Sequence, residues 1–186
     1  MNSVTKEPYP FWIPPGNLGT KNSREWTAKE AKAYFQWVME SRPVRIEKLL
    51  EYFDEVDGND HEQLLLNLGR KAMKVFLLDE FSVQKAQGRV LTDRGYALAA
   101  DVGLLLGKML VNKSGNKLEW TITRKPKSHI SCNMPVLTGF RVTGVLAVNC
   151  DPILMSIAQA SGLLDGTRGE DVWLGIYDYW KNEIPT

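Results

Sequence analysis

One stretch, residues 92–112, restricts the possible folds of this chain more than any other. Thr92 is placed as a helix N-cap, and Asp93 follows in the first turn, where the helix dipole favours an acid. Almost every later residue of the stretch is apolar, so the helix must be covered on several sides. Gly103 and Gly107, one turn apart, would let a neighbouring segment pack closely. We therefore predict a central helix, which is too short and too charged to span a bilayer.

Three charged residues interrupt this helix at intervals of seven: Arg94, Asp101 and Lys108. Residues seven apart fall near one line along a helix, so we expect them to form its only polar edge. On that edge Asp101 would pair with Arg94 or Lys108, as in an ordinary surface ion pair. The alternative is a shielded acid with a shifted pKa that binds a ligand or performs acid–base chemistry.

A hairpin is expected directly after the central helix. Residues 117–123 alternate between apolar side chains, such as Trp120, and polar ones, which is typical of a strand with one buried face. Residues 133–140 would form the returning strand and residues 142–148 a third one. We therefore expect Trp120 to be buried against the central helix.

Residues 27–81 are expected to form a layer of three amphipathic helices. The sequence Thr27-Ala28-Lys29-Glu30 is a capping box that marks the start of the first helix. Pro43 predicts the start of the second, because proline suits the first turn of a helix and disrupts its interior. Asp60 can cap the third helix. The polar residues 82–89 then predict a loop before the central helix.

Two further helices are expected near the C-terminal end. Asp151 followed by Pro152 is typical of an N-cap with proline at the first helical position. A last helix is expected at about residues 170–183. Together these patterns predict an α+β fold, mostly helical, with a small antiparallel sheet packed on a central apolar helix. We expect residues 27–186 to be a single α+β domain.

The first 26 residues predict an irregular N-terminal arm, because their prolines exclude a regular helix. The arm nevertheless carries three large apolar residues together, Phe11, Trp12 and Ile13. Since exposed apolar patches are avoided, our first interpretation is an arm packed over the protein's own core. The alternative is an arm that binds a partner or exchanges with a second copy in a homodimer.

Charge and composition argue against several functional classes. A net charge of +1 on 186 residues does not suit general binding to nucleic acid or to an acidic membrane. Cys132 and Cys150 do not form a disulfide framework, and they suit reduced, buried thiols in a cytoplasmic protein. The two histidines, His61 and His129, are not accompanied by ligands at metal-binding spacing, so we expect no metal and no other cofactor. Neither cysteine lies in a recognisable nucleophile motif with His129.

Two stretches resemble an uncharacterised family of small bacterial cytoplasmic proteins. The first runs Glu25-Trp26-Thr27-Ala28-Lys29-Glu30-Ala31-Lys32-Ala33-Tyr34-Phe35-Gln36-Trp37, followed by Arg45-Ile46. The second combines Leu98-Ala99-Ala100-Asp101-Val102-Gly103 with Leu106-Gly107, Leu118-Glu119-Trp120 and Asn133-Met134-Pro135-Val136-Leu137-Thr138-Gly139-Phe140. The resemblance implies a bacterial origin and a shared fold. Some small proteins of similar appearance are immunity proteins of bacterial toxin systems, an analogy that transfers no residue roles.

Two functional hypotheses remain. The first is a non-enzymatic protein-binding module, such as an immunity or regulatory protein, since no catalytic constellation is found and aromatic residues are abundant. Its partner-binding residues would be Phe11, Trp12, Lys125 and Lys127. The second is an enzyme or small-ligand-binding protein with a pocket beside the sheet. Its ligand-binding residues would be Asp101, Trp120, Arg124 and Asn133.

Overall fold

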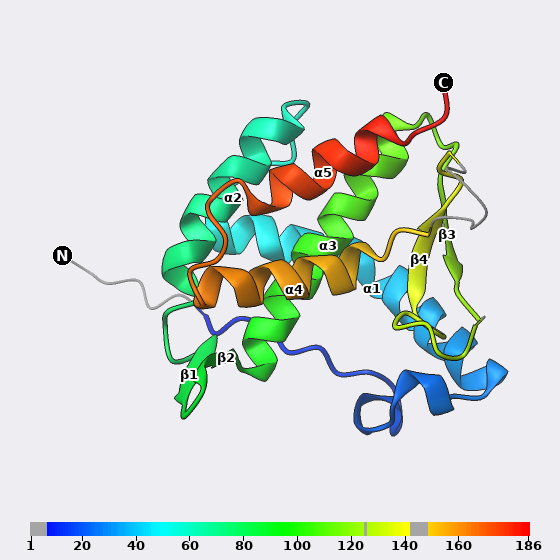
Figure 1. Cartoon of the computed structure of the whole chain (residues 1–186), viewed down its shortest axis with the longest axis horizontal. Coiled ribbons are helices and arrows are strands. Elements are labelled where there is room, and N and C mark those ends of the chain that lie inside the picture. Colours follow the sequence, from blue (N-terminus) through cyan, green and yellow to red (C-terminus); the bar gives the residue numbers. More distant parts are fainter. Residues whose placement is uncertain (1–6, 125, 142–148) are drawn as a thin grey trace.

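The computed structural model describes residues 7–124, 126–141 and 149–186. It has the expected α+β fold, mostly helical with small antiparallel sheets (Figure 1). Its helices and strands are α1 (Ala28–Phe53), α2 (His61–Val75), β1 (Ser82–Lys85), β2 (Gly88–Leu91), α3 (Asp93–Lys113), β3 (Glu119–Ile122), β4 (Pro135–Thr138), α4 (Pro152–Leu164) and α5 (Val172–Asn182). Two short 3-10 turns, η1 (Leu18–Thr20) and η2 (Ser23–Glu25), precede α1.

The apolar helix α3 lies at the centre of the molecule, as predicted. α1 packs on one side of it, and α4 and α5 pack on the other (Figure 1). All residues of α3 from Ala97 to Gly107 are buried. The Thr92 side chain caps the helix by accepting a hydrogen bond from the Gly95 amide at 3.2 Å. Burial on several sides explains why this helix needs almost no polar residues.

The two glycines of α3 confirm the predicted close packing. A Cβ atom at Gly103 would lie 2.5 Å from the Cα atom of Ile153 in α4. A Cβ atom at Gly107 would overlap the indole ring of Trp120 in β3. α3 therefore meets α4 and the sheet at distances that any larger side chain would prevent. The ring of Trp120 does pack against α3, but its side chain is only half-buried.

The prediction of two helices separated at Pro43 is wrong. α1 continues from Ala28 to Phe53 with Pro43 in its interior, so residues 27–81 contain two long helices, α1 and α2, and not three. Proline has no N–H for the carbonyl four residues earlier, which costs about 3 kcal/mol. The helix continues because Val38 and Ile46, on either side of the proline, are both buried in the same core. Core packing thus outweighs the lost hydrogen bond.

The loop predicted at residues 82–89 is also wrong. This segment forms most of the antiparallel hairpin β1–β2, in which Ser82 lies opposite Leu91 and Lys85 opposite Gly88. Only the residues at its base, Ser82 and Leu91, are buried. The hairpin depends on main-chain pairing and has few apolar side chains, so its sequence lacks the alternation that marks a half-buried strand.

The second hairpin, β3–β4, forms where the sequence predicted it. Trp120 lies opposite Leu137, and Leu137 also forms an isolated antiparallel bridge with Cys150. The third strand, expected at residues 142–148, lies outside the described residues. The two hairpins are separate two-stranded sheets, whereas we had expected a single small sheet.

The last two helices also match the sequence prediction. Asp151 caps α4 by accepting a hydrogen bond from the Leu154 amide at 2.9 Å, and Pro152 is the first helical residue. α5 begins at Val172, two residues later than expected. In the part of the chain that the structure describes, no helix has both the length and the apolar character needed to cross a membrane.

The close packing of α3 on α4 can be tested with a single methyl group. We expect Gly103→Ala to lower the free energy of unfolding by about 1–3 kcal/mol, because the added Cβ would push against the backbone at Ile153. Gly175→Ala is a matched control, since Gly175 is exposed in α5 and a Cβ there meets nothing within 4 Å. The control should stabilise by about 0.5–1 kcal/mol. Urea denaturation measures both, and an unchanged stability of Gly103→Ala would contradict the packing.

Candidate functional site

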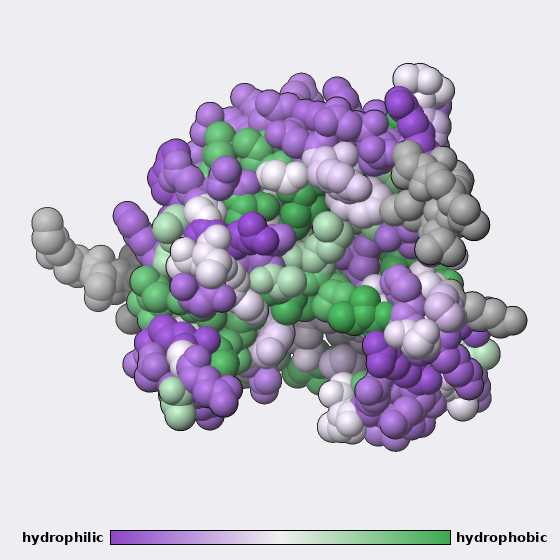
Figure 2. All heavy atoms as spheres, viewed as in Figure 1, coloured by the Kyte–Doolittle hydropathy of each residue, from purple (hydrophilic) through white to green (hydrophobic). Residues whose placement is uncertain are grey.

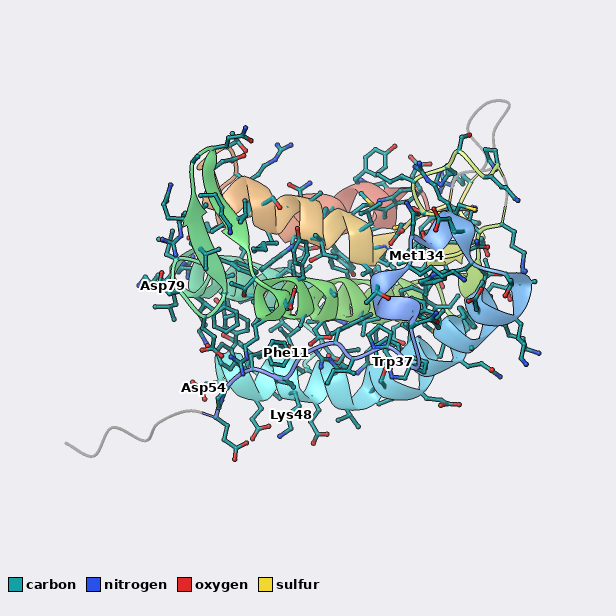
Figure 3. All side chains as sticks on the ribbon, turned by 90° about the horizontal axis from the view of Figure 1, so that it is seen from below. Phe11, Trp37, Lys48, Asp54, Asp79 and Met134 are labelled. Atoms are coloured by element: carbon teal, nitrogen blue, oxygen red, sulfur yellow. The ribbon has the colours of Figure 1, made fainter. Side chains whose placement is uncertain are left out.

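The arm, residues 7–26 in the described chain, lies over the gap between α1 and α3 (Figure 3). Tyr9 is completely buried, and its ring packs edge-on against Tyr52 of α1 with 5.2 Å between the ring centroids. Trp12 packs in the same way on Trp37, at 5.3 Å. The arm therefore covers the protein's own core, which was our first interpretation of its apolar residues.

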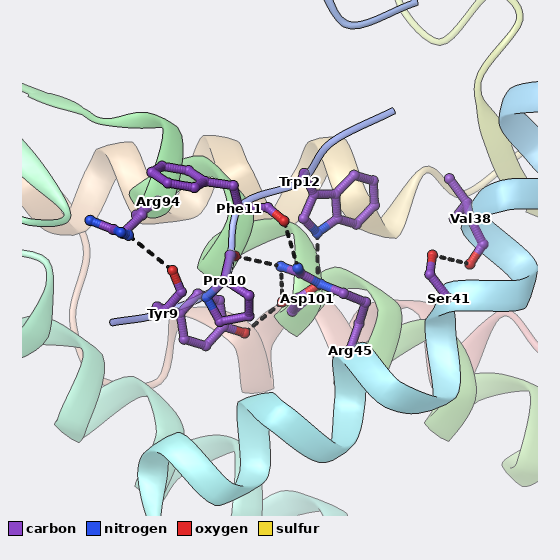
Figure 4. Close-up of polar contacts among 9 residues, drawn as sticks. All are labelled: Tyr9, Pro10, Phe11, Trp12, Val38, Ser41, Arg45, Arg94 and Asp101. Carbon is purple, nitrogen blue, oxygen red and sulfur yellow. Dashed lines mark hydrogen bonds and ion pairs between the residues drawn. The ribbon is translucent and has the colours of Figure 1, made fainter. Parts of the chain in front are cut away.

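Asp101, in the middle of α3, is fully buried beneath the arm and binds it directly (Figure 4). Its Oδ2 atom accepts a hydrogen bond from the Tyr9 hydroxyl at 2.5 Å. Its Oδ1 atom accepts one from the Trp12 indole N–H at 2.9 Å. Arg45 of α1 donates to both oxygens, from Nε at 2.9 Å and from Nη2 at 2.6 Å. One carboxylate thus joins the arm, α1 and α3.

This arrangement overturns the predicted polar edge of α3. Asp101 pairs with Arg45, and not with Arg94 or Lys108. Lys108 forms an ion pair with Asp57, while Arg94 contacts the arm. The partner of Asp101 comes from a distant part of the chain, so residue spacing along the helix could not identify it.

Asp101 has the environment of a structural residue. Burial raises the pKa of its carboxyl group, while the hydrogen bonds from Arg45, Tyr9 and Trp12 act in the opposite direction. A carboxylate offers about four acceptor positions, and four donors already occupy its two oxygens. No acceptor position is left for a substrate proton, which argues against a role as a general base.

Two arginines also fix the main chain of the arm. Arg45 donates from Nη1 to the Phe11 carbonyl at 2.9 Å and from Nη2 to the Pro10 carbonyl at 3.2 Å. Arg94 donates to the Tyr9 carbonyl at 3.0 Å, and its guanidinium lies 4.3 Å from the centroid of the Phe11 ring. Three consecutive carbonyls of the arm are therefore bound, which sets its path over α3 (Figure 4).

Asn133, another predicted ligand-binding residue, holds the second half of the arm. It is buried with a positive φ of 65°, in the left-handed region that asparagine tolerates better than most residues. Its Nδ2 atom donates to the carbonyl of Ser23 at 2.7 Å and to that of Trp26 at 3.3 Å. Both bonds tie the segment around η2 to the loop before β4, so Asn133 also acts structurally.

The remaining residues predicted to bind a ligand or partner do not form one site. Arg124 is exposed, and its Nη2 atom donates to the Ala28 carbonyl at 3.5 Å. Trp120 lies against α3, and the centroid of its ring is 6.0 Å from the guanidinium carbon of Arg42. Lys127 is exposed, and Lys125 lies outside the described residues.

An apolar groove of about 540 Å³ lies beside the docked arm. In the space-filling view the surface is hollowed below α4, and apolar side chains border the hollow (Figure 2). The groove brings together segments far apart in the sequence. Its lining residues are Phe11, Trp12, Ile13 and Gly19 of the arm, Tyr34 of α1, Asp93, Tyr96, Ala97 and Ala100 of α3, Met134 before β4, and Ile153 and Ile157 of α4.

Several apolar residues of the groove are open to solvent. The exposed fractions are 44% for Phe11, 74% for Ile13 and 48% for Tyr96. Phe11 and Trp12 were predicted as partner-binding residues, and the structure places both in the groove. Tyr96 was missed, although it is the large apolar side chain of α3 that is exposed. Asp101 is not among the residues that line this groove.

A second, smaller depression of about 190 Å³ is polar. It includes His61, whose Nδ1 lies 3.1 Å from the Tyr177 hydroxyl, and Lys181. Lys181 is paired with Glu62 and Asp178, both at 2.8 Å. Two acids, Asp60 and Glu62, and two lysines, Lys113 and Lys181, line the depression, so these four charges balance and favour neither an anion nor a cation.

The two cysteines and the possible metal ligands do not form a reactive site in the described residues. Cys132 and Cys150 are free and buried, and burial raises the pKa of the Cys150 thiol well above its usual range. A buried thiol with a raised pKa is a poor nucleophile. Within the described residues, no three His, Cys, Asp or Glu side chains are grouped as a metal site would require.

Comparison with protein-family models, with curated proteins and with solved structures gave no match for this chain. The resemblance noted from the sequence therefore remains a prediction, and function has to be argued from the geometry above.

The role of Asp101 as a buried structural carboxylate predicts a large loss of stability on substitution. Asp101→Asn should lower the free energy of unfolding by about 3–5 kcal/mol, because Arg45 would lose its counter-charge in a buried site. If Asp101 lay on a polar surface edge, the same substitution would change the free energy of unfolding by no more than about 1 kcal/mol. Glu47→Gln, at an exposed position of α1, is the control and should change stability by less than about 0.5 kcal/mol. If guanidinium denaturation shows that Asp101→Asn loses less than about 1 kcal/mol of stability, Asp101 is not a buried structural carboxylate, and the polar-edge interpretation holds.

Proposed function

We propose that this chain is a non-enzymatic protein-binding module that receives its partner in the apolar groove beside the arm. The main support is the exposure of Phe11, Ile13 and Tyr96 around a hollow that is itself lined by apolar side chains. Soluble proteins rarely leave such a contiguous apolar surface uncovered unless it binds something. Exposed aromatic residues are also enriched at the centres of protein–protein interfaces.

The chemistry of the groove supports binding over catalysis. Among the lining residues that the structure describes, the only charged side chain is that of Asp93, at the N-terminal end of α3. Tyr34 and Tyr96 supply hydroxyl groups, but no lining residue is a histidine, cysteine, serine or lysine. A nucleophile beside a base, which covalent catalysis needs, is therefore not present in the lining.

The groove depends on the docked arm, because Phe11, Trp12 and Ile13 form one of its walls. Asp101 fixes Trp12 and Tyr9, and Arg45 fixes the carbonyls next to them. Within our proposal, the buried ion pair contributes to binding indirectly, by keeping this wall in position.

We further propose, from the resemblance and the near-neutral charge, that the module works in a bacterial cytoplasm as an immunity or regulatory protein. Its buried, unpaired thiols are compatible with that reducing setting. The partner would then be a different protein, and a second copy of this chain is the alternative occupant of the groove.

The second candidate function is binding of a small apolar ligand. A volume of about 540 Å³ favours it, because small-molecule sites span about 300–1,000 Å³ and are mostly apolar. The protein-binding proposal stands first because the groove is open and its large apolar residues protrude into solvent.

Affinity capture with variants tests the proposal. We expect the immobilised chain to capture a protein from its native cells, and Tyr96→Glu to weaken capture at least about tenfold by placing a charge in the groove. Val56→Glu is the matched control, since Val56 is 82% exposed and does not line the groove. It should capture the same protein as the unchanged chain.

Three results would contradict the proposal or redirect it. If the unchanged chain, Tyr96→Glu and Val56→Glu all capture the partner equally, the groove is not the binding surface. A dimer in sedimentation analysis that Tyr96→Glu dissociates would identify a second copy as the occupant. Co-purification of a small apolar compound that Tyr96→Glu releases would favour the second candidate function.

A further inference from the structure

The position of Asp93 defines the partner of this groove more narrowly. We propose that the groove binds an amphipathic protein segment whose apolar side chains fill it and whose single lysine or arginine binds between Asp93 and Tyr96. This inference rests on the proposed function, because it describes the partner for the same groove.

The first observation is the charge pattern of the lining. Among the described residues that line the groove, Asp93 is the only charged one, and it is exposed. The Asp93 carboxylate makes no hydrogen bond or ion pair with the residues that the structure describes. The neighbouring cation, Arg94, does not neutralise it, since Arg94 binds the Tyr9 carbonyl, stacks on Phe11 and lies 3.5 Å from Glu80. The groove therefore presents one uncompensated negative charge.

The second observation is the pairing of this charge with an aromatic ring. Asp93 and Tyr96 are three residues apart in α3, so they lie on the same helix face, and both line the groove. A carboxylate beside an exposed ring suits a cation, which can form an ion pair with one and a cation–π contact with the other. An arginine suits this pair best, because its planar guanidinium can stack on the ring while donating to the carboxylate.

The helix dipole gives a simpler reason for an acid in the first turn of α3. It explains Asp93 alone. It does not explain why Tyr96 is 48% exposed, while the other large apolar side chains of α3 are not exposed, nor why an apolar groove continues from that point. The groove and the exposed ring together favour recognition.

The rest of the groove indicates how the segment would lie. Beside Tyr96, α3 contributes the small residues Ala97 and Ala100 to the lining, and α4 contributes the branched residues Ile153 and Ile157. The alanine side chains fill little space, so the groove can accept protruding apolar side chains of a partner. An amphipathic helix presents such side chains at i, i+3, i+4 and i+7, as in other helix-in-groove complexes.

The test uses synthetic helical peptides of about 14 residues, with leucines at i, i+3, i+4 and i+7 and one arginine placed at each remaining position in turn. A matched set carries glutamate in place of arginine. Fluorescence anisotropy measures binding to the full chain. We expect one arginine register to bind best, and its glutamate counterpart to bind at least about tenfold more weakly.

Exchange of the charges makes the test specific. Asp93→Asn should weaken the best arginine peptide about tenfold, and Asp93→Lys should reverse the preference in favour of the glutamate peptide. Glu47→Gln removes an acid that does not line the groove, and it should leave both affinities unchanged. Circular dichroism of each variant checks that α3 still folds.

Two outcomes would overturn this inference, and neither by itself refutes the proposed function. In the first, the arginine and glutamate peptides bind equally well, and Tyr96→Glu abolishes the binding of both. The groove would then bind apolar segments without discriminating between their charges. Failure of every peptide to bind the unchanged chain would exclude a helical occupant of this kind. The capture experiment with Tyr96→Glu would still decide whether the groove binds a protein.

Discussion

The buried carboxylate of Asp101 is the interaction on which the arrangement of this protein depends. A charge without solvent is strongly unfavourable unless an opposite charge and hydrogen bonds replace the lost water. Arg45 supplies the charge, and Tyr9 and Trp12 supply the remaining donors. Because these donors come from α1 and from the arm, a satisfied Asp101 requires both to be docked on α3. Residues 7–17 of the arm, which form no helix or strand, thus have a defined position.

The groove is a consequence of that docking. Its lining comes mainly from the arm, from the first two turns of α3 and from the start of α4, with Tyr34 of α1 and Met134 added. α4 can approach α3 so closely because Gly103 has no side chain. The Asp101–Arg45 ion pair and the contact of Gly103 with Ile153 therefore contribute to the shape of the groove, although Asp101, Arg45 and Gly103 do not line it.

The sequence predicts the parts of this structure that depend on local patterns. The apolar run of α3 must be covered from several sides, and Thr92 and Asp151 cap their helices through bonds three residues away. The partners of Asp101 could not be predicted, because Arg45 and Tyr9 are 56 and 92 residues distant. Pro43 misled the local analysis for the same reason, since long-range packing of Val38 and Ile46 holds α1 together.

The candidate site was predictable only in part. Phe11 and Trp12 are conspicuous apolar residues in a proline-rich arm, and this signal does lead to the groove. Tyr96 gave a weaker signal, because it resembles one more apolar residue of α3. Its significance depends on its exposure and on the approach of α4, which only the folded structure reveals.

The central claim is that Asp101 holds the arm against α3, and hydrogen exchange at the Trp12 indole N–H tests it most directly. This proton is donated to Asp101 at 2.9 Å, and its NMR signal can be assigned by comparison with Trp12→Phe. We predict exchange at least about 100-fold slower than in a free indole, and loss of most of that protection in Asp101→Asn. Exchange at the free-indole rate in the unchanged protein would contradict the account, because the arm would then not be docked.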